Sequence, residues 1–590
     1  MVKALRYYPL PTKTSIRLVN LWPSKQHDDQ IVCQFRIADL RDNPKYYALS
    51  YTWGAPNPAV KIICNEQPID VTPSLAAALR RLRYEDYQHL LWVDAICINQ
   101  SDQEERSLQV AMMKEIYDSA SHVYIWLGEE EKGVDKRVRH MLEYITFGYR
   151  LDVEIFEGKV PFIPPSTELT RSRRLKFDSA GWAALVKFFS HPWFKRIWVM
   201  QEAAASTAHM VYYGSEMIDW ADVCYSALYL QGANYPTMIP GLGNLTVPTI
   251  TYLYRRHSLL DLLHLTAHSK ASEPRDKIFA LLGLSIEGLE LDNYPSLKPD
   301  YGKSIVEVYA DVVHHLVRNP HNGHNSKLGV LSLVQHDIDD MMNSENWFPS
   351  WIPRWDKDRP SKSIGFSSSS KAYHASNNEP VQISDVKPKT KLMLRGLCVD
   401  MITTVNEFPH FLEKPANRRS AIHVLWTEIL SSSKRYPNGD SVLKALAMVM
   451  LSGFSDDTIL GTSSFDSANI SYHLLHALEL DIESVTGRSL GTATMSKKTR
   501  EASEPPPFRF FCGDRLFLIT TKGYIGLGPA TMQPGDLVCI LFGGITPFIL
   551  RAKDDYYTLV GEAYVYGLME GEAIREWQSG RLIEEWYLLR

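Results

Sequence analysis

The chain has 590 residues, too many for a single hydrophobic core, and 45% of them are hydrophobic and 22% charged, as in ordinary globular proteins. A formal net charge of -5 at pH 7 gives no electrostatic reason to expect nucleic acid as a partner, because nucleic acids bind basic faces. The 7 cysteines include no CxxC pair, which argues against a zinc site or a disulfide framework and favours a reducing compartment. No metal centre is expected.

Targeting and membrane signals are weak. The first residues, MVKALRYYPLPT, lack the apolar core of a signal peptide. The most apolar late run, DLVCILFGGITPFIL, is interrupted by glycines and a proline, so we expect strands and turns there and no membrane span. These features predict a cytoplasmic protein.

Patterns typical of strands and helices alternate in the first third of the chain. In order, the sequence predicts a strand at 46–53, a helix at 72–83 with Thr72 as N-cap, a strand buried on both faces at 90–98, a helix at 101–120 opened by a Ser101–Glu104 capping box, and a strand at 122–128. A polar insertion at about 129–179, a helix at 196–206 and a strand at 209–214 follow. This alternation favours an α/β fold with a parallel, doubly wound sheet of the flavodoxin-like kind.

The rest of the chain changes character twice. Residues 236–386 are expected to form a mainly helical middle region, after a first domain at 1–235. Residues 387–590 are expected to form a β-rich domain, with a helical insertion at about 416–451 and a mobile loop at about 485–507. From residue 508 onward, short strands separated by glycine and proline turns suggest a small barrel or sandwich.

One carboxylate stands out in the apolar stretch RIWVMQEAAAS. Helical spacing places Glu202 one turn after Trp198, on the same face. A core helix gains nothing from a buried carboxylate, so Glu202 is a candidate functional residue. The alternative is that Glu202 faces solvent or pairs with Arg196.

Other candidate residues follow predicted strands. Ligands bind open α/β sheets at the carboxyl ends of the strands. Ser50 and Trp53 end the first of these strands, and Asp94, with the loop that contains Asn99, ends the second. A carboxylate in a buried strand must be paired, so Asp94 either binds a ligand or caps a helix or bonds Arg106. An asparagine in such a loop more often forms a turn than binds a ligand.

Three blocks of this sequence resemble the heterokaryon-incompatibility (HET) domain of filamentous fungi. They are YYALSYTWG, LWVDAICINQSDQEERSLQVAMMKEIYDSASHVYIWLG and HPWFKRIWVMQEA, and their order and spacing agree with the family. Later segments, among them EPRDKIFALLGL and WFPSWIPRW, are similar to those that follow HET domains in long fungal proteins. The resemblance implies a role in non-self recognition, innate immunity or regulated cell death, with an incompatibility partner protein.

A more distant resemblance joins the same region to the TIR (Toll/interleukin-1 receptor) fold. The strand–helix order and the W-x-x-x-E pattern at Trp198 and Glu202 look like those of TIR domains that cleave NAD. Ser50 and Tyr51 match the first TIR strand, whereas the arginine often found after that strand is absent, since Thr52 and Trp53 stand there.

The resemblance implies NAD as a substrate, with no bound cofactor. Glu202 would be the catalytic carboxylate. The nicotinamide of NAD is already cationic, so it can leave without a general acid. A carboxylate beside the ribose and an aromatic ring are therefore sufficient for cleavage. The residues expected to bind substrate are Ser50, Tyr51, Trp53, Asp94, Asn99 and Trp198. The alternative is a non-catalytic module that signals by regulated self-association, as a homo-oligomer.

Overall fold

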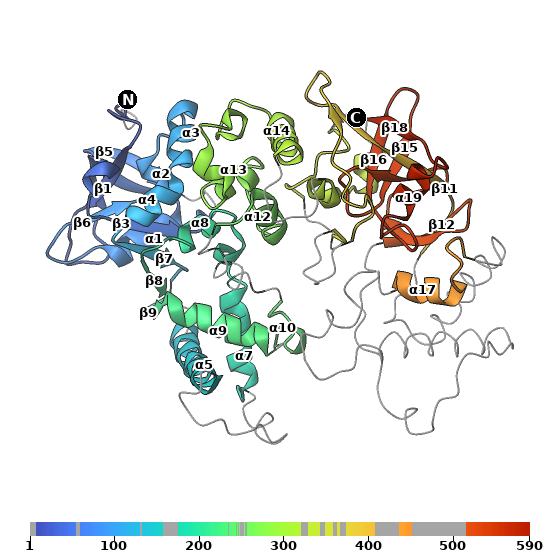
Figure 1. Ribbon diagram of the computed structural model, residues 1–590. Helices are drawn as coiled ribbons and strands as arrows, with labels where there is room; N and C mark the ends of the chain where they lie inside the picture. Colours follow the sequence, from blue (N-terminus) through green and yellow to red (C-terminus); the bar gives the residue numbers. More distant parts are fainter. Residues whose placement is uncertain are drawn as a thin grey trace. The chain divides into compact units, whose positions relative to one another are not determined.

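The computed structural model describes residues 7–54, 59–129, 133–156, 175–319 except 234, 244, 246, 248–249, 251–252 and 254–255, then 328–342, 348–357, 363–365, 373–407, 436–450 and 515–590. The chain divides into two compact units, Met1–Lys303 and Ser304–Arg590, each with its own sheet (Figure 1).

Unit 1 is built on a nine-stranded sheet in the order β5-β4-β2-β1-β6-β3-β7-β8-β9. The strands β6, β3, β7 and β8 run parallel, which confirms the predicted parallel sheet at its centre. Antiparallel pairing of β1 with β6 and of β9 with β8 makes the sheet as a whole mixed. Its strands are β1 (Ser15–Leu21), β2 (Val32–Asp39), β3 (Tyr47–Tyr51), β4 (Val60–Cys64), β5 (Gln67–Val71), β6 (His89–Trp92), β7 (His122–Trp126), β8 (Ala208–Tyr213) and β9 (Glu216–Asp219).

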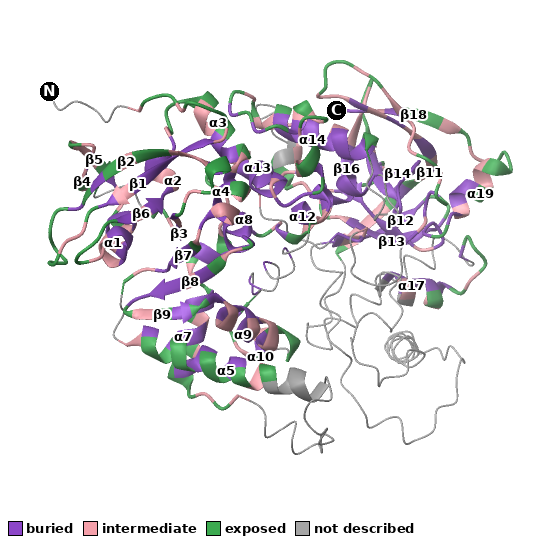
Figure 2. Cartoon of the chain, turned by 60° about the vertical axis from the view of Figure 1, so that its left-hand side comes forward, coloured by how far each residue is buried: buried purple, intermediate pink, exposed green. Residues whose placement is uncertain are grey.

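The central strands of this sheet are buried (Figure 2). The helices of unit 1 are α1 (Pro73–Leu82), α2 (Asp94–Cys97), α3 (Gln103–Ala111), α4 (Met113–Ser119), α5 (Val134–Phe156), α7 (Ser179–Phe189), α8 (Val199–Ala203), α9 (Trp220–Gly232), α10 (Tyr235–Met238), α12 (Leu259–Leu265) and α13 (Asp276–Leu282), with 3-10 turns η1 (Leu40–Asp42), η2 (Pro192–Lys195), η3 (Glu287–Glu290) and η4 (Pro295–Leu297). Of these, α5, α7, α9 and α10 gather beside the β9 edge of the sheet (Figure 2).

Local capping explains where these helices begin. The side chain of Thr72 accepts a hydrogen bond from the backbone of Leu75, so the predicted N-cap is confirmed. The predicted capping box at Ser101 is wrong. The Ser101 hydroxyl is used within the preceding turn, where it bonds Asn99, and the carboxylate of Asp102 caps α3 instead.

One further prediction is wrong in its boundary. The apolar run 90–98 is a strand only as far as Trp92, and Asp94 opens the short helix α2. Apolar runs of this length fit a buried helix as well as a strand, and α2 buries Ile96 and Cys97. The polar insertion predicted at about 129–179 contains the long helix α5; residues 157–174 of that insertion lie outside the described residues.

Unit 1 continues past residue 235, where the sequence predicted a domain boundary. The reason is α13, every residue of which is buried. It contacts α3 and α8, and the Gln201 side chain donates a 2.8 Å hydrogen bond to the Ala280 carbonyl. The segment up to Lys303 is therefore part of the same core.

Unit 2 contains a second nine-stranded sheet. The pairing of β11 with β14 closes the series β14-β15-β16-β18-β11 into a ring, so of the two folds that the sequence left open, barrel and sandwich, the structure has the barrel-like one. Its elements are α14 (Ile305–Arg318), η5 (Gly329–Leu333), α15 (Ile338–Met342), β10 (Ile383–Ser384), β11 (Leu392–Glu407), α17 (Val442–Met450), β12 (Arg515–Thr520), β13 (Ile525–Pro529), β14 (Leu537–Leu541), β15 (Phe548–Ala552), β16 (Tyr557–Glu562), β17 (Tyr564–Val565), α19 (Glu572–Gln578) and β18 (Glu584–Leu589).

Some predicted features of unit 2 cannot be compared. The mobile loop predicted at 485–507 lies outside the described residues, as does most of the predicted helical insertion, of which α17 is the described part. Within the described part of the chain, none of the helices combines the length and apolar composition that a membrane span requires.

Candidate functional site

A cavity of about 310 Å³ opens in unit 1 beside the ends of β3 and β6. Its wall carries three aromatic side chains, three cations and three carboxylates. These are Trp53, Trp198 and Tyr301; Arg106, Arg196 and Lys270; and Asp94, Glu273 and Asp276. The position fits the general rule that ligands of α/β sheets bind outside the carboxyl ends of parallel strands.

The sequence-predicted residues divide between this cavity and the core behind it. Trp53, Asp94 and Trp198 line the cavity. Among the described residues, Ser50 and Glu202 are not part of the cavity wall and are 1% and 2% exposed. Tyr51 is buried as well, also outside the cavity wall.

Glu202 is held by two partners. Its carboxylate accepts a hydrogen bond from the Ser50 hydroxyl, which in turn accepts one of 2.7 Å from the indole of Trp193. The Arg196 guanidinium lies 3.8 Å from the same carboxylate and also donates to the carbonyl of Tyr51. Arg196 lines the cavity and Glu202 does not. The pairing of Glu202 with Arg196, the alternative left open by the sequence, is present.

Burial dominates the electrostatics of this group. It raises the pKa of Glu202, against the lowering effects of Arg196 and of the Ser50 hydroxyl. Burial also raises the pKa of Asp94, although Arg196 and the Trp53 indole oppose the rise. Both carboxylates therefore hold a proton more firmly than an ordinary side chain does.

Asp94 is anchored at the mouth of the cavity. One carboxylate oxygen accepts a 2.8 Å hydrogen bond from the Trp53 indole, and the other accepts a 2.7 Å bond from the backbone of Ala95 at the start of α2. Asp94 is the first residue of α2, whose N-cap is Val93 and has no side-chain cap bond, and no direct bond joins Asp94 to Arg106 in the described residues. Asp94 both begins a helix and presents a carboxylate to the cavity.

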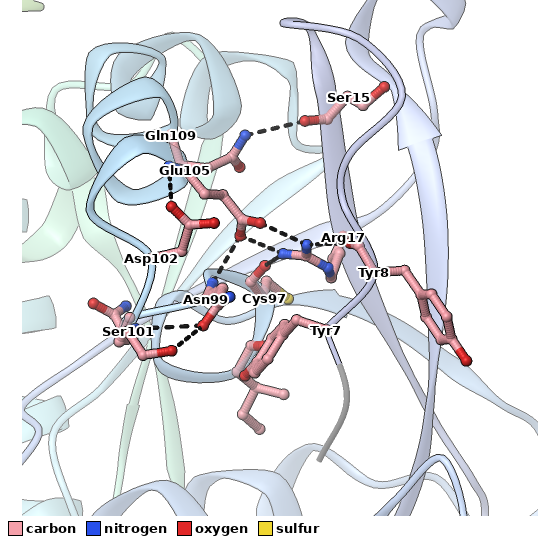
Figure 3. Close-up of polar contacts among 12 residues, drawn as sticks. Tyr7, Tyr8, Ser15, Arg17, Cys97, Asn99, Ser101, Asp102, Glu105 and Gln109 are labelled. Carbon is pink, nitrogen blue, oxygen red and sulfur yellow. Dashed lines mark hydrogen bonds and ion pairs between the residues drawn. The ribbon is translucent and has the colours of Figure 1, made fainter. Parts of the chain in front are cut away.

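Asn99 belongs to a different cluster, shown in Figure 3. Its side chain accepts from Ser101, and its backbone donates a 2.8 Å hydrogen bond to Glu105. Glu105 forms an ion pair with Arg17, which is 1% exposed and also donates to the carbonyls of Cys97 and of Tyr8. Asn99 is not among the residues that line the cavity. This ion pair fixes the α2–α3 turn against β1.

The far wall of the cavity contains residues that the sequence analysis did not select. The Trp198 indole donates a 2.9 Å hydrogen bond to Asp276, which also accepts a 2.6 Å bond from the Tyr301 hydroxyl. The guanidinium of Arg106 lies 3.7 Å from the centre of the Tyr301 ring. Asp276 belongs to the segment EPRDKIFALLGL, whose sequence gives no sign of a cavity.

Two cations of the cavity have no counter-charge in an ion pair. Among the described residues, no ion pair joins Arg106 or Lys270 to a carboxylate. Arg275, by contrast, is fully used, since it binds Glu273 at 2.8 Å and two backbone carbonyls. Arg106 packs on the Tyr301 ring and interacts electrostatically with the Glu273 and Asp276 carboxylates without forming an ion pair with either. Lys270 and Arg106 thus present positive charge to the cavity, beside aromatic faces that can stack on a planar ring. Within the described residues, no group of acidic, histidine or cysteine side chains could hold a metal ion.

Residues 46–202 match the family model described as heterokaryon incompatibility protein (HET). Residues 508–588 match the model of the Het-6 beta-barrel domain. Over 95% of its length, the chain is 26% identical to heterokaryon incompatibility protein 6, OR allele, of Neurospora crassa, and the alignment covers 94% of that relative. These findings support a HET protein, as the resemblance predicts. No solved structure matches the chain.

Proposed function

We propose that this chain acts in heterokaryon incompatibility as an effector of regulated cell death, and that unit 1 binds and cleaves NAD. The first part rests on the family matches and on the name of the Neurospora crassa relative. The second rests on one observation: a cavity at the ends of parallel strands that combines aromatic rings, cations and carboxylates. The TIR resemblance supplies the reaction and remains a prediction.

Each class of cavity residue matches one part of NAD. Arg106 and Lys270 would bind the pyrophosphate, since charged hydrogen bonds to phosphate oxygens are strong. Trp53, which is 41% exposed, and Trp198 offer faces on which the nicotinamide or adenine ring would stack. A carboxylate near the ribose would stabilise the oxocarbenium ion that forms as nicotinamide departs.

Two carboxylates can take that catalytic role. Glu202 is the residue that the TIR resemblance predicts, but it does not line the cavity, so it reaches the ribose only if the cavity wall moves. Asp94 already lines the cavity and needs no such movement. We propose Glu202 as the catalytic residue, and the comparison of Glu202 and Asp94 variants tests this choice.

Nicotinamide release from NAD by the full chain tests the proposal. We expect turnover in the wild type, a loss of about a hundredfold or more in Glu202→Gln, and a smaller loss in Asp94→Asn. The opposite order would assign the carboxylate role to Asp94. A folded wild type that releases no nicotinamide would reject NAD cleavage and favour the non-catalytic alternative, signalling by self-association, which light scattering would then measure.

A further inference from the structure

Two cysteines face each other across the strand pair that closes the barrel of unit 2. Cys398 on β11 is directly opposite Cys539 on β14 in the antiparallel register. Both thiols are free. The two strands lie side by side in Figure 2, and their pairing completes the ring of strands.

The geometry of such a pair suits a disulfide bond. Residues directly opposite in an antiparallel pair have Cα atoms about 4.5–5.5 Å apart and side chains on the same face of the sheet. Disulfides form when the Cα atoms are about 4.4–6.8 Å apart. Cys398 and Cys539 are register partners at the end of the regular stretch that begins at Gly396, just before the register shifts between Cys398 and Asp400, so regular ladder spacing would place them within this range.

The reactivity of Cys398 differs from that of the other opposed pair in the described residues. Cys398 is partly exposed, and a hydrogen bond with Cys539 lowers the pKa of its thiol. Cys33 and Cys64, opposite each other on β2 and β4, are 2% and 0% exposed, and interaction with Cys64 together with burial raises the pKa of Cys33. The thiolate is the reactive form, so Cys398 is expected to react first with a disulfide from solution. Cys539 is buried and the pKa of its thiol is raised, so it reacts only with a sulfur already bonded to Cys398. The pair in unit 1, in which both thiols are buried, is expected to stay inert.

We propose that Cys398 and Cys539 form a reversible oxidation site for low-molecular-weight disulfides, such as oxidised glutathione. The Cys398 thiolate attacks one sulfur of oxidised glutathione and displaces one glutathione thiolate. The Cys539 thiol then attacks the Cys398 sulfur of the mixed disulfide and loses its proton to the departing second glutathione thiolate, a slower step because burial raises the pKa of Cys539. Two protein thiols become one disulfide while one oxidised glutathione becomes two reduced molecules.

The bond would connect β11 to β14 where the ring closes. Because more than a hundred residues separate the two cysteines in sequence, the cross-link would restrict a long loop of the unfolded chain. The oxidised barrel should therefore unfold at a higher temperature than the reduced one. Reduction by a dithiol would restore the original melting temperature.

The test uses the full chain with Cys512→Ser, since Cys512 lies outside the described residues and could act as a rival partner. After treatment with oxidised glutathione, we expect a mass loss equal to two hydrogen atoms and a proteolytic fragment that links Cys398 to Cys539. Cys33 and Cys64 should stay reduced and react with an alkylating reagent only after unfolding. Cys398→Ser should abolish the mass loss.

A second variant separates chemistry from folding. Cys539→Ala keeps a small apolar side chain in the buried position and should leave Cys398 as a stable mixed disulfide with glutathione. The proposal is overturned if the protein with both cysteines accumulates that same mixed disulfide without the internal bond. It is also overturned if Cys33 and Cys64 oxidise first, or if all thiols remain reduced in the folded chain.

Discussion

Neutralising Glu202 is expected to change stability less than the loss of a buried ion pair usually does. At 3.8 Å and an effective dielectric constant of about 20, attraction between Glu202 and Arg196 amounts to about 4 kcal/mol. This attraction is opposed by the free-energy cost of removing the carboxylate from water, which is also several kcal/mol. Because burial raises the pKa of Glu202, the cost exceeds the attraction. Arg196 also keeps its bond to the Tyr51 carbonyl, so we expect Glu202→Gln to cost less than about 1.5 kcal/mol at pH 7.

The pH dependence gives the sharper test. A carboxyl group whose pKa is raised in the folded state binds its proton more firmly there than in the unfolded chain. The contribution of Glu202 to stability is therefore complete below its unfolded pKa, about 4.3, and is lost as the pH rises toward the folded value. Gln does not titrate, so the free energy of unfolding of Glu202→Gln should improve relative to wild type as the pH rises.

Urea unfolding of wild type and Glu202→Gln measures this difference in the free energy of unfolding. The measurements should span about pH 4.5 to 8, where a carboxyl group with a raised pKa changes the stability. Nicotinamide release from the same samples separates a catalytic from a positioning role. A uniform loss of about 3–5 kcal/mol at every pH would refute the reasoning, because it would mean that the ion pair outweighs desolvation. Glu202→Ala, which also removes the acceptor of the Ser50 hydroxyl, should be less stable than Glu202→Gln.

Four further outcomes are expected. Arg106→Gln should weaken NAD binding in equilibrium dialysis about ten- to a hundredfold. The control is Arg81→Gln, which changes an arginine stacked on a tyrosine outside the cavity and should leave NAD binding unchanged. Glu105→Ala should cost about 3–5 kcal/mol in urea unfolding, since it leaves a buried arginine without its ion-pair partner. Burial lowers the pKa of His191 to about 4, so wild-type stability should fall by roughly 1–3 kcal/mol as the pH falls from 6.5 to 4, and His191→Asn should flatten that dependence in urea unfolding. A fragment ending at Lys303 should unfold cooperatively by circular dichroism, whereas one ending near residue 231 should aggregate, because it lacks α13.

Much of the central sheet could be predicted from the sequence because parallel strands leave a simple pattern. Strands buried on both faces read as apolar runs, and β3, β7 and β8 lie where such runs were found. The same rule failed at β6, because α2 continues the apolar run in a helical conformation. A buried one-turn helix and a buried strand end both consist of apolar residues with little solvent exposure. Only their tertiary contacts decide which of the two conformations the run adopts.

The cavity could be predicted only in part, because half of its wall comes from far along the chain. Trp53 and Asp94 follow strands whose carboxyl ends meet, so a positional rule found them. Arg106 sits on a helix among other charged residues and looks from sequence like a solvated side chain, until α13 and Tyr301 cover it. No local pattern indicates that a lysine at position 270 faces the same space.

The spacing of Trp198 and Glu202 shows what local periodicity leaves undecided. The backbone of Glu202 does bond to the carbonyl of Trp198, so the two residues are one helical turn apart as predicted. Their side chains nevertheless take different partners. Asp276, 78 residues further on, holds the tryptophan at the cavity, while Ser50, 152 residues earlier, holds the carboxylate in the core. Helical spacing brings two residues close together, but their distant partners decide which of them contacts a ligand. The role of Glu202 therefore has to be tested by measuring stability and turnover on the same variants.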